Sequence, residues 1–188
     1  MKDITIIILG DKENDYGVIP SNIELVRADN STFYDIVKGV KTKYIGFIKS
    51  NDIVSDNYFN LISLKVKLDF DGCFINYTLD CVDKNVKIMM NDKELVSKRP
   101  IFGEYIWSYI YRTEIFNKVI EIKDVEEFNK RVEFEFYRLT VISEVIYTHK
   151  TNGISVLSDF CYKDMRESMH FKNAIYMVVD VTEFLMVI

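Results

Sequence analysis

A chain of 188 residues, of which 48% are hydrophobic, is long enough and apolar enough for one domain with a sizeable core. Its formal net charge of −5 and its pI near 5.2 argue against a general nucleic-acid-binding protein, because phosphate neutralisation requires clustered Lys and Arg. The apolar runs are too short for a signal peptide or a membrane span, so we expect a single cytoplasmic domain over residues 1–188.

The first fifty residues alternate between apolar runs and one amphipathic segment. Residues 4–10 (ITIIILG) are continuously apolar and β-branched, which predicts a strand covered on both faces. Residues 23–29 and 44–48 predict two further strands, and residues 30–41 between them predict a helix from their apolar spacing. This alternation predicts a largely parallel sheet.

Further helices and strands are predicted beyond residue 50. We expect helices at residues 55–68, 103–116 and 125–142, and strands at residues 71–80, 86–90 and 143–149. Residues 174–181 fit either a strand or a buried helix, because periodicity does not separate the two.

Few familiar catalytic or metal-binding signatures occur in the sequence. Cys73, Cys81 and Cys161 lie in apolar or strand-like segments without metal-ligand spacing, so we expect reduced, unligated thiols. The sequence has no Gly-rich phosphate loop, no nucleophile elbow and no His-x-x-x-His pair.

A cluster of polar residues follows the predicted strand at residues 44–48. The chain continues as Lys49, Ser50, Asn51 and Asp52. Open α/β folds bind ligands beyond the carboxyl ends of their central strands, so the cluster is a candidate ligand site. A solvated turn leading into the next helix is an equally good interpretation.

The order of elements around this cluster resembles the central segment of the family 2 glycosyltransferases, GT-A fold enzymes that use nucleotide sugars. In that family the strand ends in an acidic cluster like Asp-Ser-Asp-Asp, where this chain has Lys-Ser-Asn-Asp. Residues 107–116 resemble the family's Trp-x-Lys-x-Tyr-Arg-x-Glu-x-Phe phrase, residues 123–131 its acidic Glu-Asp-x-x-Phe segment, and residues 145–155 its tail phrase with Tyr-x-Tyr or Tyr-x-His. The resemblance covers residues 4–157 and implies an α/β fold of the GT-A type, a mixed sheet with central parallel strands flanked by helices.

The resemblance also implies where a nucleotide-sugar donor and an acceptor bind. The implied residues are Glu126 or Glu127 as the base that deprotonates the acceptor hydroxyl, Asp11, Asp29, Lys49, Asn51 and Asp52 at the donor, and Trp107, Arg112 and His149 at the acceptor. The two N-terminal carboxylates stand in for the family's nucleotide-binding unit, since too few residues precede the cluster for that unit at full size.

An ordinary structural role is the alternative for several of these residues. Trp107 lies among aromatic residues at near-helical spacing, which usually fill a core. Glu126 and Glu127 would complement a helix dipole whatever the protein does. His149, on a predicted strand near aromatics, also suits a structural or surface role.

The acidic cluster departs from the family pattern at two positions. Lys49 and Asn51 replace acidic residues, so Asp52 is left as the single carboxylate for Mg²⁺ or Mn²⁺, and such a site would bind either ion poorly. The Lys49 ammonium could stabilise the donor diphosphate itself, as a point charge, in a metal-independent enzyme.

We therefore expect a glycosyltransferase that transfers a sugar from a nucleotide-sugar donor to a hydroxyl of a carbohydrate or other acceptor. The alternative is a non-catalytic GT-A-like binding or assembly module that has lost turnover. The sequence leaves the donor sugar, the acceptor and the oligomeric state open.

Overall fold

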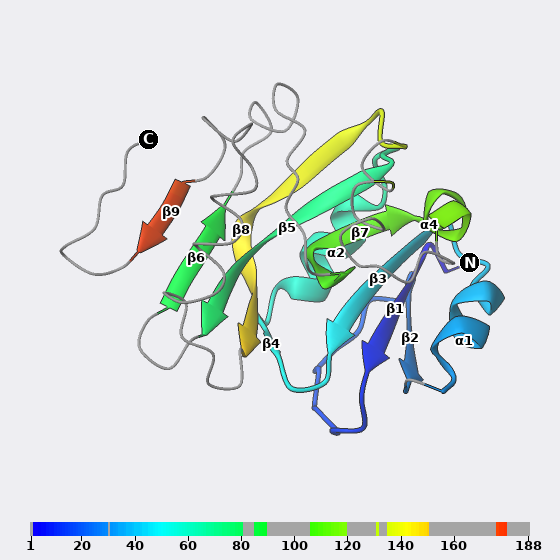
Figure 1. The fold of residues 1–188 in the computed structure, drawn as a ribbon, viewed down its shortest axis with the longest axis horizontal. Helices are drawn as coiled ribbons and strands as arrows, with labels where there is room; N and C mark the ends of the chain where they lie inside the picture. Colours follow the sequence, from blue (N-terminus) through cyan, green and yellow to red (C-terminus); the bar gives the residue numbers. More distant parts are fainter. Residues whose placement is uncertain are drawn as a thin grey trace.

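Nine strands of the described chain form one mixed sheet (Figure 1). The fold is given by a computed structural model that describes residues 2–29, 31–80, 85–89, 106–119, 131, 135–150 and 176–179. The strands are β1 (Ile4–Leu9), β2 (Ile23–Ala28), β3 (Tyr44–Lys49), β4 (Ile53–Val54), β5 (Gly72–Asp80), β6 (Asn85–Met89), β7 (Tyr109–Arg112), β8 (Leu139–Lys150) and β9 (Tyr176–Val179). The helical segments are α1 (Phe33–Gly39), α2 (Tyr58–Lys65), the short 3-10 helix η1 (Ile106–Ser108) and α4 (Thr113–Val119).

The strand order is β2-β1-β3-β7-β5-β6-β9, with β8 beside β5 and β4 beside β8. Strands β1, β2 and β3 are parallel, β7 is antiparallel to both β3 and β5, and β8 is parallel to β5. Strands β1, β2, β3, β5 and β8 therefore all end at the same edge of the sheet, the lower edge in Figure 1. We call it the carboxyl-end edge.

The predicted central position of residues 44–48 is confirmed. Strand β3 lies between β1 and β7, and its residues from Tyr44 to Ile48 are buried. Gly46 allows the tight packing there, because a Cβ atom at this position would lie 2.5 Å from Ile110 Cδ1 and 2.7 Å from Ile6 Cδ1. Continuous β-branched and aromatic runs suit strands that are covered on both faces.

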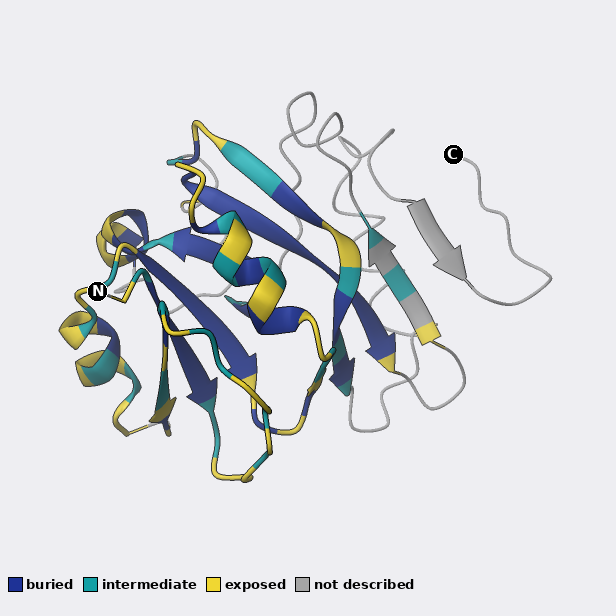
Figure 2. Cartoon of the chain, turned by 180° about the vertical axis from the view of Figure 1, so that it is seen from behind, coloured by how far each residue is buried: buried dark blue, intermediate teal, exposed yellow. Residues whose placement is uncertain are grey.

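Helix α2 lies across one face of the sheet, as Figure 2 shows from behind. It buries Tyr58, Phe59 and Ile62 against the sheet and leaves Leu64 exposed. None of the described helices is both long and apolar enough to cross a bilayer.

The helix predicted at residues 103–116 is wrong at residues 109–112 and confirmed at residues 113–116. Residues 106–108 form η1, residues 109–112 form β7, and a helix begins only at Thr113. Tyr109, Ile110 and Tyr111 are all buried, and β7 pairs with β3 on one side and with β5 on the other. Pairing with two strands outweighs the local helical spacing of the aromatics.

The helix predicted at residues 125–142 is wrong at its end. Residues 139–142 begin β8, where Val141 and Ile142 are buried and pair with β5. The predicted strand at residues 143–149 is confirmed as the rest of β8. Residues 125–130 and 132–134 lie outside the described residues.

The other predictions of secondary structure are confirmed. The predicted strands and helices at residues 4–10, 23–29, 30–41, 55–68, 71–80 and 86–90 appear as β1, β2, α1, α2, β5 and β6. For residues 174–181 the strand is observed, as β9. Cys73 is a buried thiol, whereas Cys81 and Cys161 lie outside the described residues.

Candidate functional site at the carboxyl-end edge

The polar cluster forms a tight turn at the end of β3, which we call the 49–52 turn. The Asp52 amide donates a hydrogen bond to the Lys49 carbonyl over 2.9 Å. Ser50 and Asp52 are buried, with exposed fractions of 4% and 5%, whereas Lys49 and Asn51 are exposed. The turn therefore directs two polar side chains into the protein and offers the other two to solvent.

Asp52 joins this turn to the end of β8. Its Oδ2 accepts a hydrogen bond from the Tyr147 hydroxyl over 2.6 Å, and its Oδ1 accepts one from the Lys150 amide over 3.0 Å. His149 Nδ1 lies 3.0 Å from Oδ1 and 2.9 Å from Oδ2. The Asp52 side chain is 1% exposed, so its carboxylate interacts with donors inside the protein and not with solvent.

The Tyr147 hydroxyl links the two ends of the turn. It accepts a hydrogen bond from the Lys49 amide over 3.0 Å and donates one to Asp52. Burial, and then the charge of Asp52, raise the pKa of Tyr147 well above its ordinary value, so the hydroxyl keeps its proton for that bond. Trp107 stacks on the Tyr147 ring with centroids 4.5 Å apart and planes 7° apart, which fixes the ring from behind.

The loop after β1 holds the other side of the turn. The Asn14 amide group donates a hydrogen bond to the Ser50 carbonyl over 2.6 Å, and the Ser50 amide donates to the Leu9 carbonyl over 2.9 Å. Gly10, directly after β1, has a φ of +103°, and a Cβ atom there would lie 2.5 Å from Ser50 Oγ. The turn is thus attached on both sides, and the side chains of Lys49 and Asn51 project from a rigid support.

Known proteins share this architecture. No family model matches the sequence. The sequence is 23% identical over 196 residues to EpsJ of Bacillus subtilis (strain 168), an uncharacterised glycosyltransferase, and the match covers 87% of this chain and 57% of EpsJ. The structure matches S. aureus TarS 1–349 in complex with UDP-GlcNAc at a TM-score of 0.54 and 12% identity, over 82% of this chain and 60% of that one. The complex of TarS 1–349 with UDP matches at a TM-score of 0.54 and 14% identity.

The chain has the fold of the TarS glycosyltransferase. The resemblance to glycosyltransferases is thereby confirmed at the level of the fold, and the α/β fold class with it. The chain spans 57% of EpsJ and 60% of TarS 1–349, so it corresponds to only part of each.

The two N-terminal carboxylates lie near the same edge, directly after β1 and β2. Asp11 is exposed. Asp29 Oδ1 accepts four hydrogen bonds, from the amides and hydroxyls of Ser31 and Thr32, at the start of α1. These bonds, chiefly that from the Ser31 hydroxyl, lower the pKa of Asp29 to about 2. Asp29 thus has a structural role in α1, and contact of either carboxylate with a nucleotide stays a prediction.

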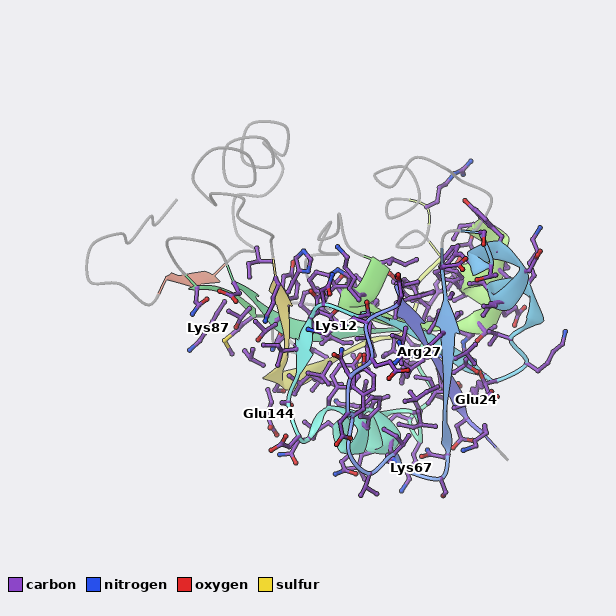
Figure 3. All side chains as sticks on the ribbon, turned by 90° about the horizontal axis from the view of Figure 1, so that it is seen from below. Lys12, Glu24, Arg27, Lys67, Lys87 and Glu144 are labelled. Carbon is purple, nitrogen blue, oxygen red and sulfur yellow. The ribbon has the colours of Figure 1, made fainter. Side chains whose placement is uncertain are left out.

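Two basic residues, Lys12 and Arg27, lie close to these carboxylates in the sequence, at the ends of the same two strands. Figure 3 looks onto the carboxyl-end edge and shows Lys12 and Arg27 beside the ends of β1 and β2. Arg27 donates a hydrogen bond to the Lys12 carbonyl over 2.9 Å and is itself exposed. With Lys49 and Lys150, they give this edge several cations in a chain whose net charge is negative.

Arg112, predicted at the acceptor, lies at the opposite edge of the sheet. It ends β7 opposite Tyr44, the first residue of β3, and it forms ion pairs with Asp69 over 2.6 Å and Asp71 over 2.9 Å. The antiparallel course of β7 carries Arg112 away from the 49–52 turn. Arg112 therefore does not lie with the 49–52 turn, and its contact with an acceptor stays a prediction.

Trp107, also predicted at the acceptor, is buried with an exposed fraction of 1%. Its ring packs against Tyr77, Tyr147 and His149, so the alternative of core packing describes it and stacking on a sugar does not. His149 is buried beside Asp52 and belongs to the support of the turn. Glu126 and Glu127 lie outside the described residues.

A divalent ion does not fit at Asp52. Mg²⁺ binds oxygen ligands at about 2.1 Å and requires several of them. Here Tyr147, His149 and Lys150 direct their donors at the two carboxylate oxygens, and the next side chains are an ammonium and an amide. Among the residues that the structure describes, no three His, Cys, Asp or Glu side chains are grouped to hold a metal.

Several supports of the site were missed from the sequence. Tyr147 and Lys150 lie within the tail phrase at residues 145–155, so its Tyr-x-His pattern was the available signal. Gly10, directly after an apolar strand, could have indicated a backbone position that a side chain cannot occupy. Asn14 lies in a polar loop with nothing to distinguish it from its neighbours.

Proposed function

We propose that this chain is a glycosyltransferase domain that transfers a sugar from a nucleotide-sugar donor to a hydroxyl acceptor at the carboxyl-end edge. The observation that carries the proposal is the rigid 49–52 turn, which presents Lys49 and Asn51 beyond the end of the central strand β3. The known complexes of TarS 1–349, which shares the fold, contain UDP-GlcNAc and UDP, and both support a uridine nucleotide as the first donor to test.

The turn suits the leaving group of this reaction. As the bond between the sugar's anomeric carbon and the diphosphate breaks, negative charge grows on the diphosphate oxygens. Lys49 can place its ammonium at that charge, and Asn51 can donate an amide hydrogen to it. Since the described residues do not suit a metal there, these two groups would supply the stabilisation.

The acceptor hydroxyl would attack the anomeric carbon from the opposite side, with inversion. A new bond between its oxygen and the anomeric carbon forms as the diphosphate bond breaks, and the hydroxyl proton passes to a carboxylate. The resemblance to family 2 glycosyltransferases assigns that base to Glu126 or Glu127. The products are the glycosylated acceptor and the nucleoside diphosphate.

Calorimetric titration with UDP, in EDTA and then in Mn²⁺, tests the donor site. We expect binding without metal, and the Lys49→Ala variant should lose about 1 to 2 kcal/mol of binding free energy because a charge-assisted contact to phosphate disappears.

Lys67→Ala is the matched control. Lys67 is exposed and lies just past α2, next to Leu68, whose carbonyl accepts a hydrogen bond from Tyr44 at the opposite edge. This control should bind UDP like the unmodified protein. Absence of heat with UDP, GDP, CDP and their sugars would instead support the non-catalytic binding or assembly module.

A further inference from the structure

We infer that Asp52 is a positioning residue and not a metal ligand: together with Tyr147, His149 and the Lys150 amide it forms a clamp that holds Lys49 and Asn51 in place for the donor diphosphate. We call these four groups the Asp52 clamp. The inference rests on the proposed function for the identity of the ligand, and on the geometry of the described residues for the clamp itself.

The first argument is the occupancy of the Asp52 oxygens. Oδ1 faces the Lys150 amide at 3.0 Å and His149 Nδ1 at 3.0 Å, and Oδ2 faces the Tyr147 hydroxyl at 2.6 Å and the same nitrogen at 2.9 Å. A cation at either oxygen would meet the positive hydrogens of these donors. With the side chain 1% exposed, the ion would also have to enter a closed space.

The second argument is mechanical. The Tyr147 hydroxyl is bonded to the Lys49 amide at the start of the turn and to the Asp52 carboxylate at its end. Directly after the turn, β4 pairs with β8 in a register that sets Val54 opposite Tyr147. The clamp and this pairing together fix the position of the turn along β8. They therefore also fix the point from which the Lys49 side chain projects.

The third argument concerns charge. Although Lys49 and Asp52 are three positions apart, the Asp52 carboxylate turns inward to the clamp, and none of the ion pairs among the described residues involves Lys49. The Lys49 ammonium is therefore available to an anionic ligand. If Asp52 faced outward, as a metal ligand must, it would instead reduce the positive potential at that point.

The experiment compares Asp52→Asn with Tyr147→Phe. Tyr147→Phe removes one hydroxyl of the clamp and no carboxylate, so a metal-ligand role of Asp52 predicts no effect on UDP binding. The clamp predicts that both variants weaken UDP binding by about tenfold, equally in EDTA and in Mn²⁺, and that the double variant is no weaker than the worse single variant. Tyr137→Phe, at an 84% exposed tyrosine, is the matched control and should bind UDP unchanged.

Two results would overturn the inference. One is a gain of UDP affinity with Mn²⁺ that Asp52→Asn abolishes and Tyr147→Phe keeps. The other is UDP binding by Tyr147→Phe that equals that of the unmodified protein. If Asp52→Asn does not fold, the unmodified protein still gives a test with Mn²⁺ alone: paramagnetic broadening centred on the amides of residues 49–52 would show a metal site there, whereas the clamp predicts none.

Failure of the proposed function is a separate outcome. If the unmodified protein binds no UDP under either condition, the donor assignment is wrong, and amide hydrogen exchange then tests the clamp without any ligand. The Lys49 amide should exchange faster in Tyr147→Phe, because it loses its acceptor hydroxyl. The Lys150 amide should exchange faster in Asp52→Asn, because its acceptor changes from a carboxylate to an amide. Unchanged exchange at both amides would overturn the clamp as well.

Discussion

At Gly10, backbone conformation and packing both oppose a side chain. Its φ of +103° lies in a region that L-residues rarely adopt, and a Cβ atom would lie 2.5 Å from Ser50 Oγ. The Ser50 backbone is bonded to Leu9 and Asn14, so relief of this contact requires rotation of the buried Ser50 side chain. One glycine thus determines how closely the end of β1 approaches the 49–52 turn.

We expect Gly10→Ala to lower the free energy of unfolding by about 2 to 4 kcal/mol, from backbone strain and the contact with Ser50 together. Gly17→Ala is the control, because Gly17 also has a positive φ, of +64°, but its Cβ would meet nothing within 4 Å. Its loss should be about 1 kcal/mol, from strain alone. Urea denaturation measures the free energy of unfolding of both variants. Equal decreases would mean that the contact with Ser50 adds nothing to the cost of Gly10→Ala.

At the scale of elements, α1 depends on the group that precedes it. The helix has seven residues, too few to be stable by propensity alone. Asp29 Oδ1 accepts hydrogen bonds from Ser31 and Thr32, and the Asp29 carbonyl accepts one from the Phe33 amide. Asp29 therefore fixes the start of α1, the crossover between β2 and β3.

The hydrogen bonds that the Asp29 carboxylate accepts predict a pH dependence. The pKa of Asp29 is about 2 in the folded protein and 3.8 in an unperturbed chain, so its contribution to stability is complete above pH 5 and is lost as the pH falls towards 2. The unmodified protein should unfold at a higher temperature than Asp29→Asn at pH 6, and the two should converge near pH 2.

At the scale of the whole molecule, the two edges of the sheet carry different groups of polar residues. The carboxyl-end edge has the 49–52 turn and its clamp. The opposite edge has an ionic cluster in which Arg112 and Arg138 pair with Asp69 and Asp71. Asp71 also accepts hydrogen bonds from the Tyr137 and Arg138 amides, at 3.1 and 2.9 Å, and so joins β5, β7 and β8.

The Asp71 carboxylate is held in its charged form. Burial alone would raise its pKa, but the Arg138 and Tyr137 amides and the Arg112 guanidinium outweigh burial and lower the pKa of Asp71. Breaking a paired charge at such a position is costly, because the remaining partner keeps its desolvation penalty.

We therefore expect Arg112→Gln to lower the free energy of unfolding by about 1 to 3 kcal/mol, since Asp71 loses a charge-assisted partner. UDP binding by the folded variant should be unchanged, because Arg112 lies at the edge away from Lys49. Lys49→Ala should show the reverse, with weaker binding and little change in stability. Thermal unfolding measures the change in stability of each variant, and calorimetry measures UDP binding by the folded protein. Weaker UDP binding by folded Arg112→Gln would indicate that Arg112 does contribute to the binding site.

The sequence by itself determined the parallel half of the sheet. Residues 4–10 and 44–48 are apolar runs, and residues 23–29 mix apolar side chains with Glu24, Arg27 and Asp29. Such short segments favour strands, and the helix between the last two has its own apolar spacing. The position of the 49–52 turn followed from these elements, because a parallel strand ends where its apolar run ends. Strand propensity and helical spacing depend on neighbouring residues, so they can be recognised in a single stretch of sequence.

Only the tertiary structure decided the rest. Residues 109–112 form a strand because β3 and β5 both offer backbone partners, and their aromatic spacing alone suggested a helix. Asp52 was expected at the donor and, at most, as a weak metal ligand, but its carboxylate faces Tyr147, His149 and Lys150, which are 95, 97 and 98 residues further along the chain. The direction of a carboxylate depends on the donors that the fold brings to it, and a clamp formed by residues so far apart has no local pattern.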